Sequence, residues 1–268
     1  YFFFGLHPAS WHIVHIVWHA FNSVLLFLFI LLFFKILLPK RSLKDTTSSE
    51  IIRHATLLSA LLGSLLFLVH PIHAEIVNWV AAVPELALFS CALLSILFFL
   101  LAQKKPSFRL LSAFFFFVAT LSKETGYLLL FFLIFLDFFL LPLAEPLKKS
   151  IILWLKENWI FFMATAVSLA LRSFAPYDQS TNVLIPGPPF LLFNVFFDGP
   201  VILLQYLSHF LFPLHLSFLY PFQPMKLERF PWGVLSSILS IVLLLFWKYS
   251  FSKKYTLPSL FVWIFSVT

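Results

Sequence analysis

Two imidazoles and two carboxylates lie within sixteen residues of one another, beginning where an apolar run ends. They are His70, His73, Glu75 and Glu85, and the first three belong to the sequence HPIHAEIVNW at residues 70–79. Ionisable groups are costly at a membrane boundary, where they usually mark a functional site. Such groups can bind a metal ion, cap a helix end or contact the oxygens of a phosphate. The residue types leave these three interpretations open.

The spacing of the two histidines differs from that of the helical zinc motif. His70 and His73 are three residues apart, whereas that motif places two histidines at positions i and i+4. In the phosphate interpretation both imidazoles contact phosphate or pyrophosphate oxygens, and Glu75 orients one of them. We therefore expect no metal and no cofactor, while helix capping and phosphate contact both stay open.

A second group of charges interrupts an apolar stretch farther along the chain. Lys123 and Glu124 belong to SKETG at residues 122–126, within the apolar residues 110–141. The two neighbours either neutralise each other, or Lys123 meets a phosphate as a point charge while Glu124 fixes another group. Arg172, near the end of a later apolar run, either snorkels to the interface or has a comparable role.

The first apolar segment carries a polar stripe. His12, His15, His19 and Asn22 follow one another at spacings of three and four, which places them on one face of a helix. We expect this face to hydrogen-bond with other helices inside a bundle, with a catalytic role as the alternative. Asp137, within another apolar run, is expected to face the bundle or the cytoplasmic edge.

The elements that must position these groups are membrane helices by composition. Of 268 residues, 61% are hydrophobic and 11% are charged, and the mean hydropathy is +0.98. A soluble domain carries roughly 25% charged residues. The composition predicts an all-α, polytopic transmembrane helix bundle in a single domain, residues 1–268. Since a spanning helix needs roughly 20 apolar residues, we expect about seven to nine membrane segments.

The apolar runs give the expected order of these segments. Residues 176–232 contain nine of the 17 prolines, and we expect helices there that lie along the non-cytoplasmic interface or re-enter the membrane. The stretch at 110–141 is expected to form a helical hairpin with SKETG at its tip. The remaining predicted spans are residues 11–34, 55–70, 86–103, 158–175 and 233–247, with another beginning at 257.

The distribution of basic residues predicts the sidedness of the chain. The net charge is +7, and most of the 18 Lys and Arg residues fall in short loops on one side if the spans alternate. The positive-inside rule assigns that side to the cytoplasm and argues for a lipid bilayer, not nucleic acid, as the partner. The segment at 70–79, the SKETG tip and the loop after residue 175 then share the opposite face.

Five motifs in one order carry a family resemblance. They are WHIVHIVWHAFN at 11–22, HPIHAEIVNW at 70–79, LSKETG at 121–126, FLDF at 135–138 and FPLHLSFLYP at 212–221. Together they resemble the membrane part of the transmembrane-and-TPR protein O-mannosyltransferases and their bacterial relatives, which are GT-C glycosyltransferases. The chain departs from that pattern at His15, where relatives have Asn. It also lacks the relatives' Arg residues near Val83 and near Gln205.

The resemblance implies a GT-C fold that takes a sugar from a polyprenyl- or dolichyl-phosphate donor. The acceptor, a protein hydroxyl or a glycan, would be glycosylated on the non-cytoplasmic side. Such enzymes carry an acidic general base in the first external loop, so the base is expected upstream of Tyr1. The chain is accordingly expected to be a fragment that lacks both ends. Its location would be the bacterial inner membrane or the endoplasmic reticulum, as an integral, multi-pass protein.

These arguments together name a candidate site. We expect the imidazoles and Lys123 to contact the lipid-linked phosphate, and the glutamates to orient groups or the acceptor. The main lining residues are His70, His73, Glu75, Glu85, Lys123 and Glu124, and the secondary ones are His12, His19, Asn22, Arg172 and Tyr220. The alternatives are a transporter or flippase of lipid-linked intermediates, which uses the same cavity without chemistry, and a structural membrane subunit.

Overall fold

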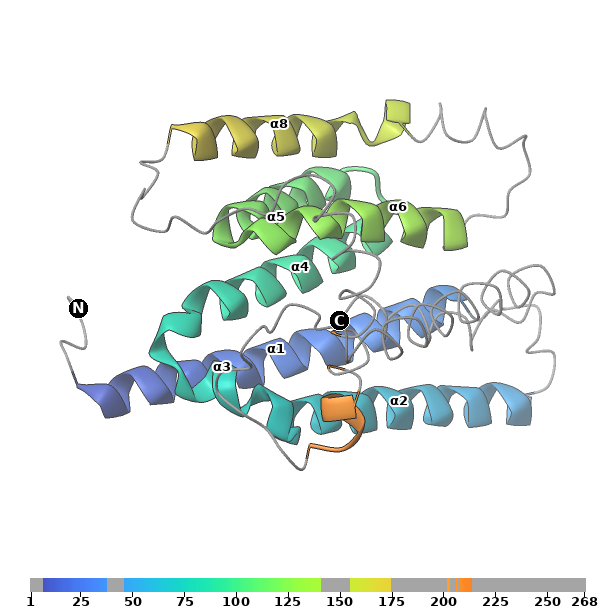
Figure 1. Ribbon diagram of the computed structural model, residues 1–268. Helices are drawn as coiled ribbons and strands as arrows, with labels where there is room; N and C mark the ends of the chain where they lie inside the picture. The colour runs from blue at the N-terminus through green and yellow to red at the C-terminus, as the bar shows by residue number, and fades with distance from the viewer. Residues whose placement is uncertain are drawn as a thin grey trace, which may run out of the picture. The chain divides into compact units, whose positions relative to one another are not determined.

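The computed structural model describes residues 7–37, 46–140, 155–174, 202, 206 and 208–213. Every regular element in these ranges is a helix, as the all-α prediction requires (Figure 1). The chain divides into two compact units, Tyr1–Tyr177 and Asp178–Thr268, and all the labelled helices belong to the first. In the second unit, residues 208–211 are helical.

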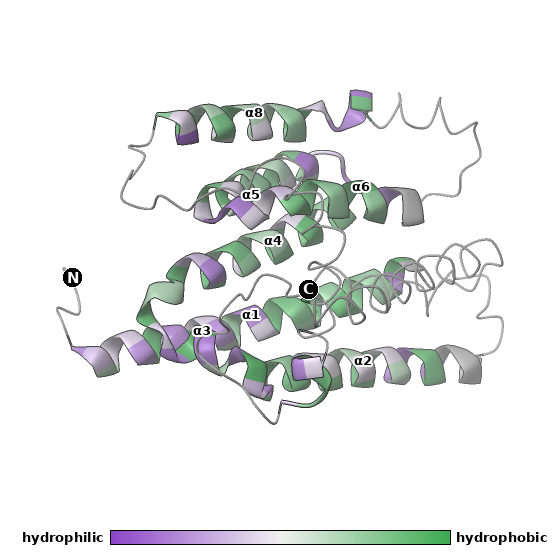
Figure 2. Ribbon diagram, in the orientation of Figure 1, coloured by the Kyte–Doolittle hydropathy of each residue, from purple (hydrophilic) through white to green (hydrophobic). Residues whose placement is uncertain are grey.

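Three helices in the described ranges are long and apolar enough to cross a membrane. The first two lie within α1 (Pro8–Leu37) and α2 (Thr46–Val69), and the third, Val80–Ala102, contains α4 (Val83–Ala102). They correspond to the predicted spans at 11–34, 55–70 and 86–103. Figure 2 shows hydrophobic residues, in green, along much of these helices, with hydrophilic residues in purple near the start of α1. The predicted interfacial or re-entrant segment at 176–232 lies largely outside the described residues, and the predicted spans at 233–247 and from 257 lie wholly outside them.

A corner of three short helices joins α2 to α4. It consists of η2 (Pro71–His73), α3 (Ala74–Asn78) and η3 (Val80–Ala82). Pro71 has no backbone N–H, so it cannot continue α2 but suits the first position of a new helix. The polar segment recognised in the sequence is therefore a compact turn between two apolar helices.

The expected interruption at residues 122–126 is confirmed. α5 (Phe108–Ser122) ends there, Lys123 is extended, and η4 (Glu124–Tyr127) leads into α6 (Leu128–Leu140). Gly126 is buried so close to α5 that a Cβ atom would lie 2.5 Å from the Ala119 carbonyl oxygen. Only glycine fits this approach of η4 to the backbone of α5.

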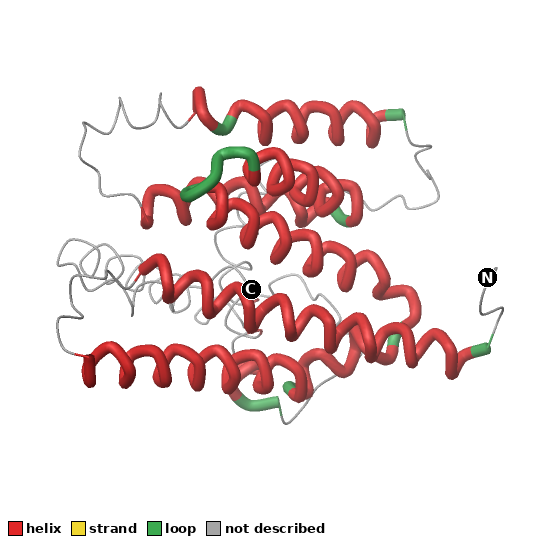
Figure 3. The backbone as a smooth tube through the Cα atoms, turned by 180° about the vertical axis from the view of Figure 1, so that it is seen from behind, coloured by secondary structure: helices red, strands yellow, loops and turns green. Residues whose placement is uncertain are grey.

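The helices of the first unit pack in a series. α1 contacts α2 and α4, α4 contacts α5, and α5 contacts α8 (Trp159–Ser173), as Figures 1 and 3 show from opposite sides. Phe161 of α8 meets the rings of Phe99 and Phe116 edge-on, with centroids 6.0 and 5.6 Å apart. These buried rings form the core between α4, α5 and α8. The outer face of α2 instead leaves its leucines exposed, as a lipid-facing surface requires.

Candidate functional site

The polar stripe on α1 faces other helices, as predicted. His15, His19 and Asn22 are buried, with 0%, 5% and 1% of their surfaces exposed, while Ile13 and Val17 on the opposite face are 61% and 63% exposed. α1 therefore has one polar face inside the bundle and one apolar face outside it. His12 is half-buried, and its Nδ1 atom has no hydrogen-bond partner among the residues described.

Two histidines of the stripe hydrogen-bond the ends of neighbouring helices. His19 Nε2 donates to the Leu68 carbonyl oxygen at 3.2 Å, and His15 Nδ1 donates to the Ile76 carbonyl oxygen at 3.0 Å. Leu68 and Ile76 lie in the last turns of α2 and α3, where carbonyl groups have no partner within the helix. The imidazoles of α1 thus cap the C-termini of two other helices and set their positions.

Asn22 extends the stripe to the start of α4. Trp18 Nε1 donates to Ser90 Oγ at 2.7 Å, the Ser90 hydroxyl donates to Asn22 Oδ1, and Asn22 Nδ2 donates to the Leu86 carbonyl oxygen at 3.2 Å. This chain of hydrogen bonds joins α1 to the first turns of α4, directly beside Glu85. Sequence reasoning missed Trp18 and Ser90, although Trp18 lies four residues before Asn22 on the same helix.

Three imidazoles form a cluster where α1 meets the corner after α2. The ring of His73 lies 5.1 Å from that of His19 and 6.3 Å from that of His70, measured between centroids. Phe67 covers the same ring at 4.3 Å. The structure therefore brings the two histidines of the HPIHAEIVNW motif together with one from the polar stripe. We call His19, His70 and His73 the imidazole cluster.

Burial controls the protonation of His73, one member of the imidazole cluster. The pKa of His73 is lowered from 6.5 to about 4, chiefly because burial disfavours the charged ring and further because His19 and His70 lie beside it. The His73 ring is therefore neutral near pH 7, so it can donate a hydrogen bond but carries no positive charge.

The other members of the motif have different environments. The backbone N–H of Ile72 donates to His70 Nδ1 at 3.2 Å, so His70 performs the helix-capping role that the sequence left open. Glu75 is exposed on α3, and its carboxylate makes no hydrogen bond or ion pair with any residue that the structure describes. The expected orientation of an imidazole by Glu75 is not observed within those ranges.

Two ion pairs connect the SKETG segment to other helices. Lys123 Nζ donates to Glu85 Oε1 at 2.6 Å, which joins the end of α5 to the first turn of α4. Glu124 pairs with Arg172 at the end of α8. The two neighbours thus neutralise groups on separate helices instead of each other. Glu85 Oε2 is buried and has no hydrogen-bond partner among the described residues.

Arg172 has more contacts than a snorkelling side chain would make. Its Nε and Nη2 atoms donate to the Thr120 carbonyl oxygen at 3.2 and 2.7 Å, and its Nη1 atom contacts Glu124. The guanidinium carbon also lies 5.9 Å from the centre of the Tyr127 ring. The pKa of Glu124 is lowered, first by a hydrogen bond from the backbone N–H of Glu124 and then by the hydrogen bond and the charge of Arg172. Both charges of this pair are therefore present near pH 7.

These groups share one end of the helix bundle. We call the described residues 12–22, 68–86, 120–127 and 168–172 the polar end, which lies where α1 begins (left in Figure 1). His12, His19, Asn22 and Arg172 belong to it together with the six main candidates, whereas Tyr220 lies outside the described residues. Within the described ranges, no three His, Cys, Asp or Glu side chains are grouped to hold a metal ion.

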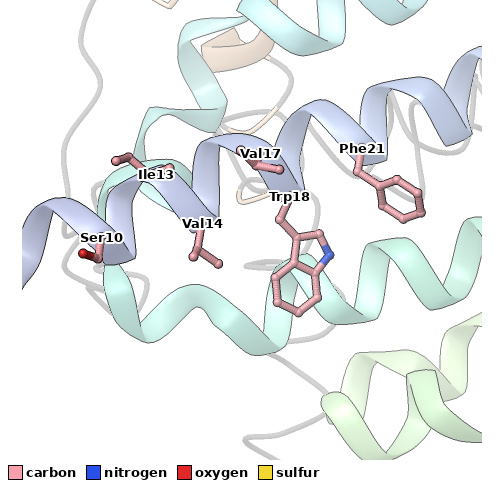
Figure 4. A pocket seen from close by; sticks show the side chains of 6 residues that line it. All are labelled: Ser10, Ile13, Val14, Val17, Trp18 and Phe21. Carbon is pink, nitrogen blue, oxygen red and sulfur yellow. The ribbon is translucent and has the colours of Figure 1, made fainter. Parts of the chain in front are cut away.

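An open apolar groove runs along α1 beside the polar end. It measures about 540 Å³, and Figure 4 shows the described side chains that line it: Ser10, Ile13, Val14, Val17, Trp18 and Phe21. The lining is almost entirely hydrocarbon and aromatic, so the groove suits an apolar ligand better than a sugar. Trp18 belongs to this groove and also to the hydrogen-bond chain that reaches Glu85's neighbour, Leu86.

Comparison with known proteins adds no family assignment. No protein-family model matches the chain, and neither a curated protein nor a solved structure is significantly similar to it. The GT-C relationship suggested by the five motifs therefore stays a prediction.

Proposed function

We propose that the chain is part of a GT-C-type membrane glycosyltransferase that transfers a sugar from a polyprenyl- or dolichyl-phosphate donor to a protein hydroxyl or glycan. The observation that carries the proposal is that one end of an apolar bundle holds both the imidazole cluster and the Lys123–Glu85 ion pair, which come from separate helices. In this proposal the protein crosses the membrane several times, with about seven to nine apolar segments of roughly the length that a spanning helix needs. The membrane is the bacterial inner membrane or the endoplasmic reticulum.

The chemistry of the polar end matches a phosphate head group. Lys123 supplies a positive charge that is 38% exposed, and Glu85 restrains its position. His70 and His73 supply imidazole N–H groups, which can donate to phosphate oxygens without carrying a charge. A donor phosphate that meets these groups is stabilised by one cation and neutral donors, an arrangement that also suits the charge left on the phosphate after sugar transfer.

The apolar groove fits the other half of the same ligand. Ile13, Val17 and Phe21 present hydrocarbon and aromatic surface along the part of α1 whose opposite face carries His15 and His19. An isoprenoid chain would find hydrocarbon and aromatic contacts along this groove on the outer face of α1. A ligand with an apolar tail and an anionic head therefore accounts for both surfaces, and for the cost of keeping ionisable groups at a membrane boundary.

A transfer assay tests the proposal. The full-length protein is reconstituted in lipid vesicles with a radiolabelled dolichyl-phosphate mannose and serine- or threonine-containing acceptor peptides. We expect transfer that falls about a hundredfold in Lys123→Ala and in His73→Ala, because each removes a group that contacts the phosphate. Lys105→Ala is the matched control, since Lys105 is exposed beyond the far end of α4 and makes no ion pair with the described residues.

The outcomes separate the possible functions. Wild-type rates in both Lys123→Ala and His73→Ala contradict the proposal. If the donor crosses the vesicle membrane without sugar transfer, and this movement is lost in the same two variants, the protein is a flippase. If the protein binds no polyprenyl phosphate, it is neither a transferase nor a flippase of such lipids.

A further inference from the structure

We infer that Arg172 is a positioning residue for Lys123: its guanidinium bonds the backbone before that lysine and contacts the side chains of Glu124 and Tyr127 after it, and so aims the ammonium at Glu85. The inference rests on the proposed function, in which Lys123 contacts the donor phosphate. The three guanidinium nitrogens of Arg172 each bond a protein oxygen, so we assign its effect on the phosphate to Lys123.

On the N-terminal side, Arg172 closes the end of α5. The helix stops at Ser122, which leaves its last carbonyl groups without partners inside the helix. Thr120 accepts from Nε and Nη2 at 3.2 and 2.7 Å, and Leu121 accepts from Nη2 at 3.4 Å. A cation at a helix C-terminus is also favoured by the helix dipole. These bonds fix the last turn before Lys123.

On the C-terminal side, Arg172 fixes η4. Its Nη1 atom pairs with Glu124, the residue after Lys123, and the guanidinium lies over the Tyr127 ring. Ser168, one turn before Arg172 on α8, donates to the Tyr127 hydroxyl at 3.2 Å. α8 therefore contacts both ends of η4. Lys123 lies between two segments that are attached to the same guanidinium.

The geometry requires an arginine at this position. A guanidinium presents five N–H donors in a rigid plane, whereas a lysine ammonium is a single point charge on a flexible chain. Lysine at position 172 could keep the ion pair with Glu124 or cap Thr120, but it could not bond both in the same arrangement. Arg172→Lys therefore keeps the charge and removes the double attachment.

The first experiment measures the position of Lys123 without any ligand. The full-length protein in vesicles is labelled briefly with an amine-reactive reagent, and each lysine is quantified by peptide mass spectrometry. We expect Arg172→Lys to raise the labelling rate of Lys123 about tenfold, as the loss of a charge-assisted hydrogen bond allows, with Lys105 unchanged. Glu124→Gln, a milder change on one side only, is expected to raise it less. An unchanged Lys123 rate in Arg172→Lys overturns the inference, whatever the function.

The second experiment connects position to ligand binding. Affinity for vesicles containing dolichyl phosphate is measured for wild type, Arg172→Lys, Lys123→Ala and the double variant. We expect about tenfold weaker binding in each single variant and no further loss in the double variant. Additive losses contradict the inference, because Arg172 then acts on the phosphate independently of Lys123. A third outcome separates the inference from the proposed function. If Lys123 is labelled faster in Arg172→Lys but Lys123→Ala binds dolichyl-phosphate vesicles as wild type does, Arg172 positions Lys123 and the proposed function is contradicted.

Discussion

His73 and His70 show how the two interpretations that their motif left open can hold together. The ring of His73 lies against those of His19 and Phe67, and burial there removes the positive charge of the ring near pH 7. The neighbouring His70 uses Nδ1 to cap a short helix, so capping and ligand contact need not exclude each other. At this scale the candidate site combines the neutral ring of His73, the capping ring of His70 and the ion pair of Lys123 with Glu85.

The lowered pKa of His73 gives the folded protein a defined sensitivity to acid. An unfolded chain binds a proton at this histidine near pH 6.5, whereas the folded protein does so only near pH 4. Between these values the unfolded state holds more protons, so acidification lowers the free energy of unfolding. The stability that neutral His73 contributes is present above pH 6.5 and is lost as the pH falls toward 4.

Unfolding in detergent micelles, followed by circular dichroism between pH 7.5 and 4, measures this effect. We expect His73→Gln to have a smaller loss of stability over that range than wild type. His54→Gln, at an exposed position on α2, serves as the control and should retain the wild-type loss. Equal pH dependence in wild type and His73→Gln contradicts the prediction.

At the scale of elements, side chains from one helix close the C-termini of others. His19 and His15 of α1 cap α2 and α3, and Arg172 of α8 caps α5. Carbonyl groups at helix ends are costly to leave unpaired in an apolar environment. Capping from a neighbouring helix satisfies them and also fixes how the helices meet, so the polar end is a structural device as well as a candidate site.

The junction between α5 and η4 gives the sharpest test of this arrangement. In Gly126→Ala the new methyl group would lie 2.5 Å from the Ala119 carbonyl oxygen and 2.9 Å from Thr120 Cα, both backbone atoms that cannot turn aside. We expect a loss of about 1–3 kcal/mol in the free energy of unfolding. Donor-lipid binding is expected to weaken as well, because Lys123 lies in the displaced segment.

A second glycine provides the matched control for this change. A Cβ atom at Gly63, within α2, would meet only the flexible Cδ1 atom of Ile30 at 3.2 Å. Gly63→Ala also favours the helix by its intrinsic propensity, so we expect little change or a slight gain in stability. If Gly126→Ala unfolds at the same denaturant concentration as Gly63→Ala, the close packing of η4 on α5 is not required.

The helices could be predicted from local patterns in the sequence, whereas the contacts between helices could not. Apolar runs of sufficient length predicted α1, α2 and α4, and three-and-four spacing predicted the buried face of α1. Asp137 is buried as expected, but its partner Gln103 was not foreseen. Pairs such as Glu85 with Lys123 form only when distant segments fold together, and spacing along one chain carries no information about them.

For the whole molecule, the two ends of the bundle differ in their number of basic residues. At the polar end, the corner at residues 70–82 contains no Lys or Arg, and Lys123 and Arg172 each pair with a carboxylate. At the other end, Lys104 and Lys105 are exposed in the turn after α4, and Arg109 at the start of α5 pairs with Glu157. The positive-inside rule counts Lys and Arg in short loops, so it favours the cytoplasmic side for this turn and the opposite side for the polar end.

Cysteine labelling tests this sidedness directly. In a Cys91→Ala background, Glu75→Cys and Lys105→Cys place thiols at two exposed positions, one at each end of the bundle. We expect a membrane-impermeant maleimide added to intact cells or sealed organelle vesicles of known orientation to reach position 75 only from the non-cytoplasmic side. Position 105 should react only from the cytoplasmic side, or after permeabilisation.

The opposite labelling pattern would put the imidazole cluster and Lys123 on the cytoplasmic side. A lumenal or periplasmic acceptor cannot reach them there, so this result would remove the basis for the proposed transferase. Labelling of both positions from one side would show that α4 does not cross the membrane.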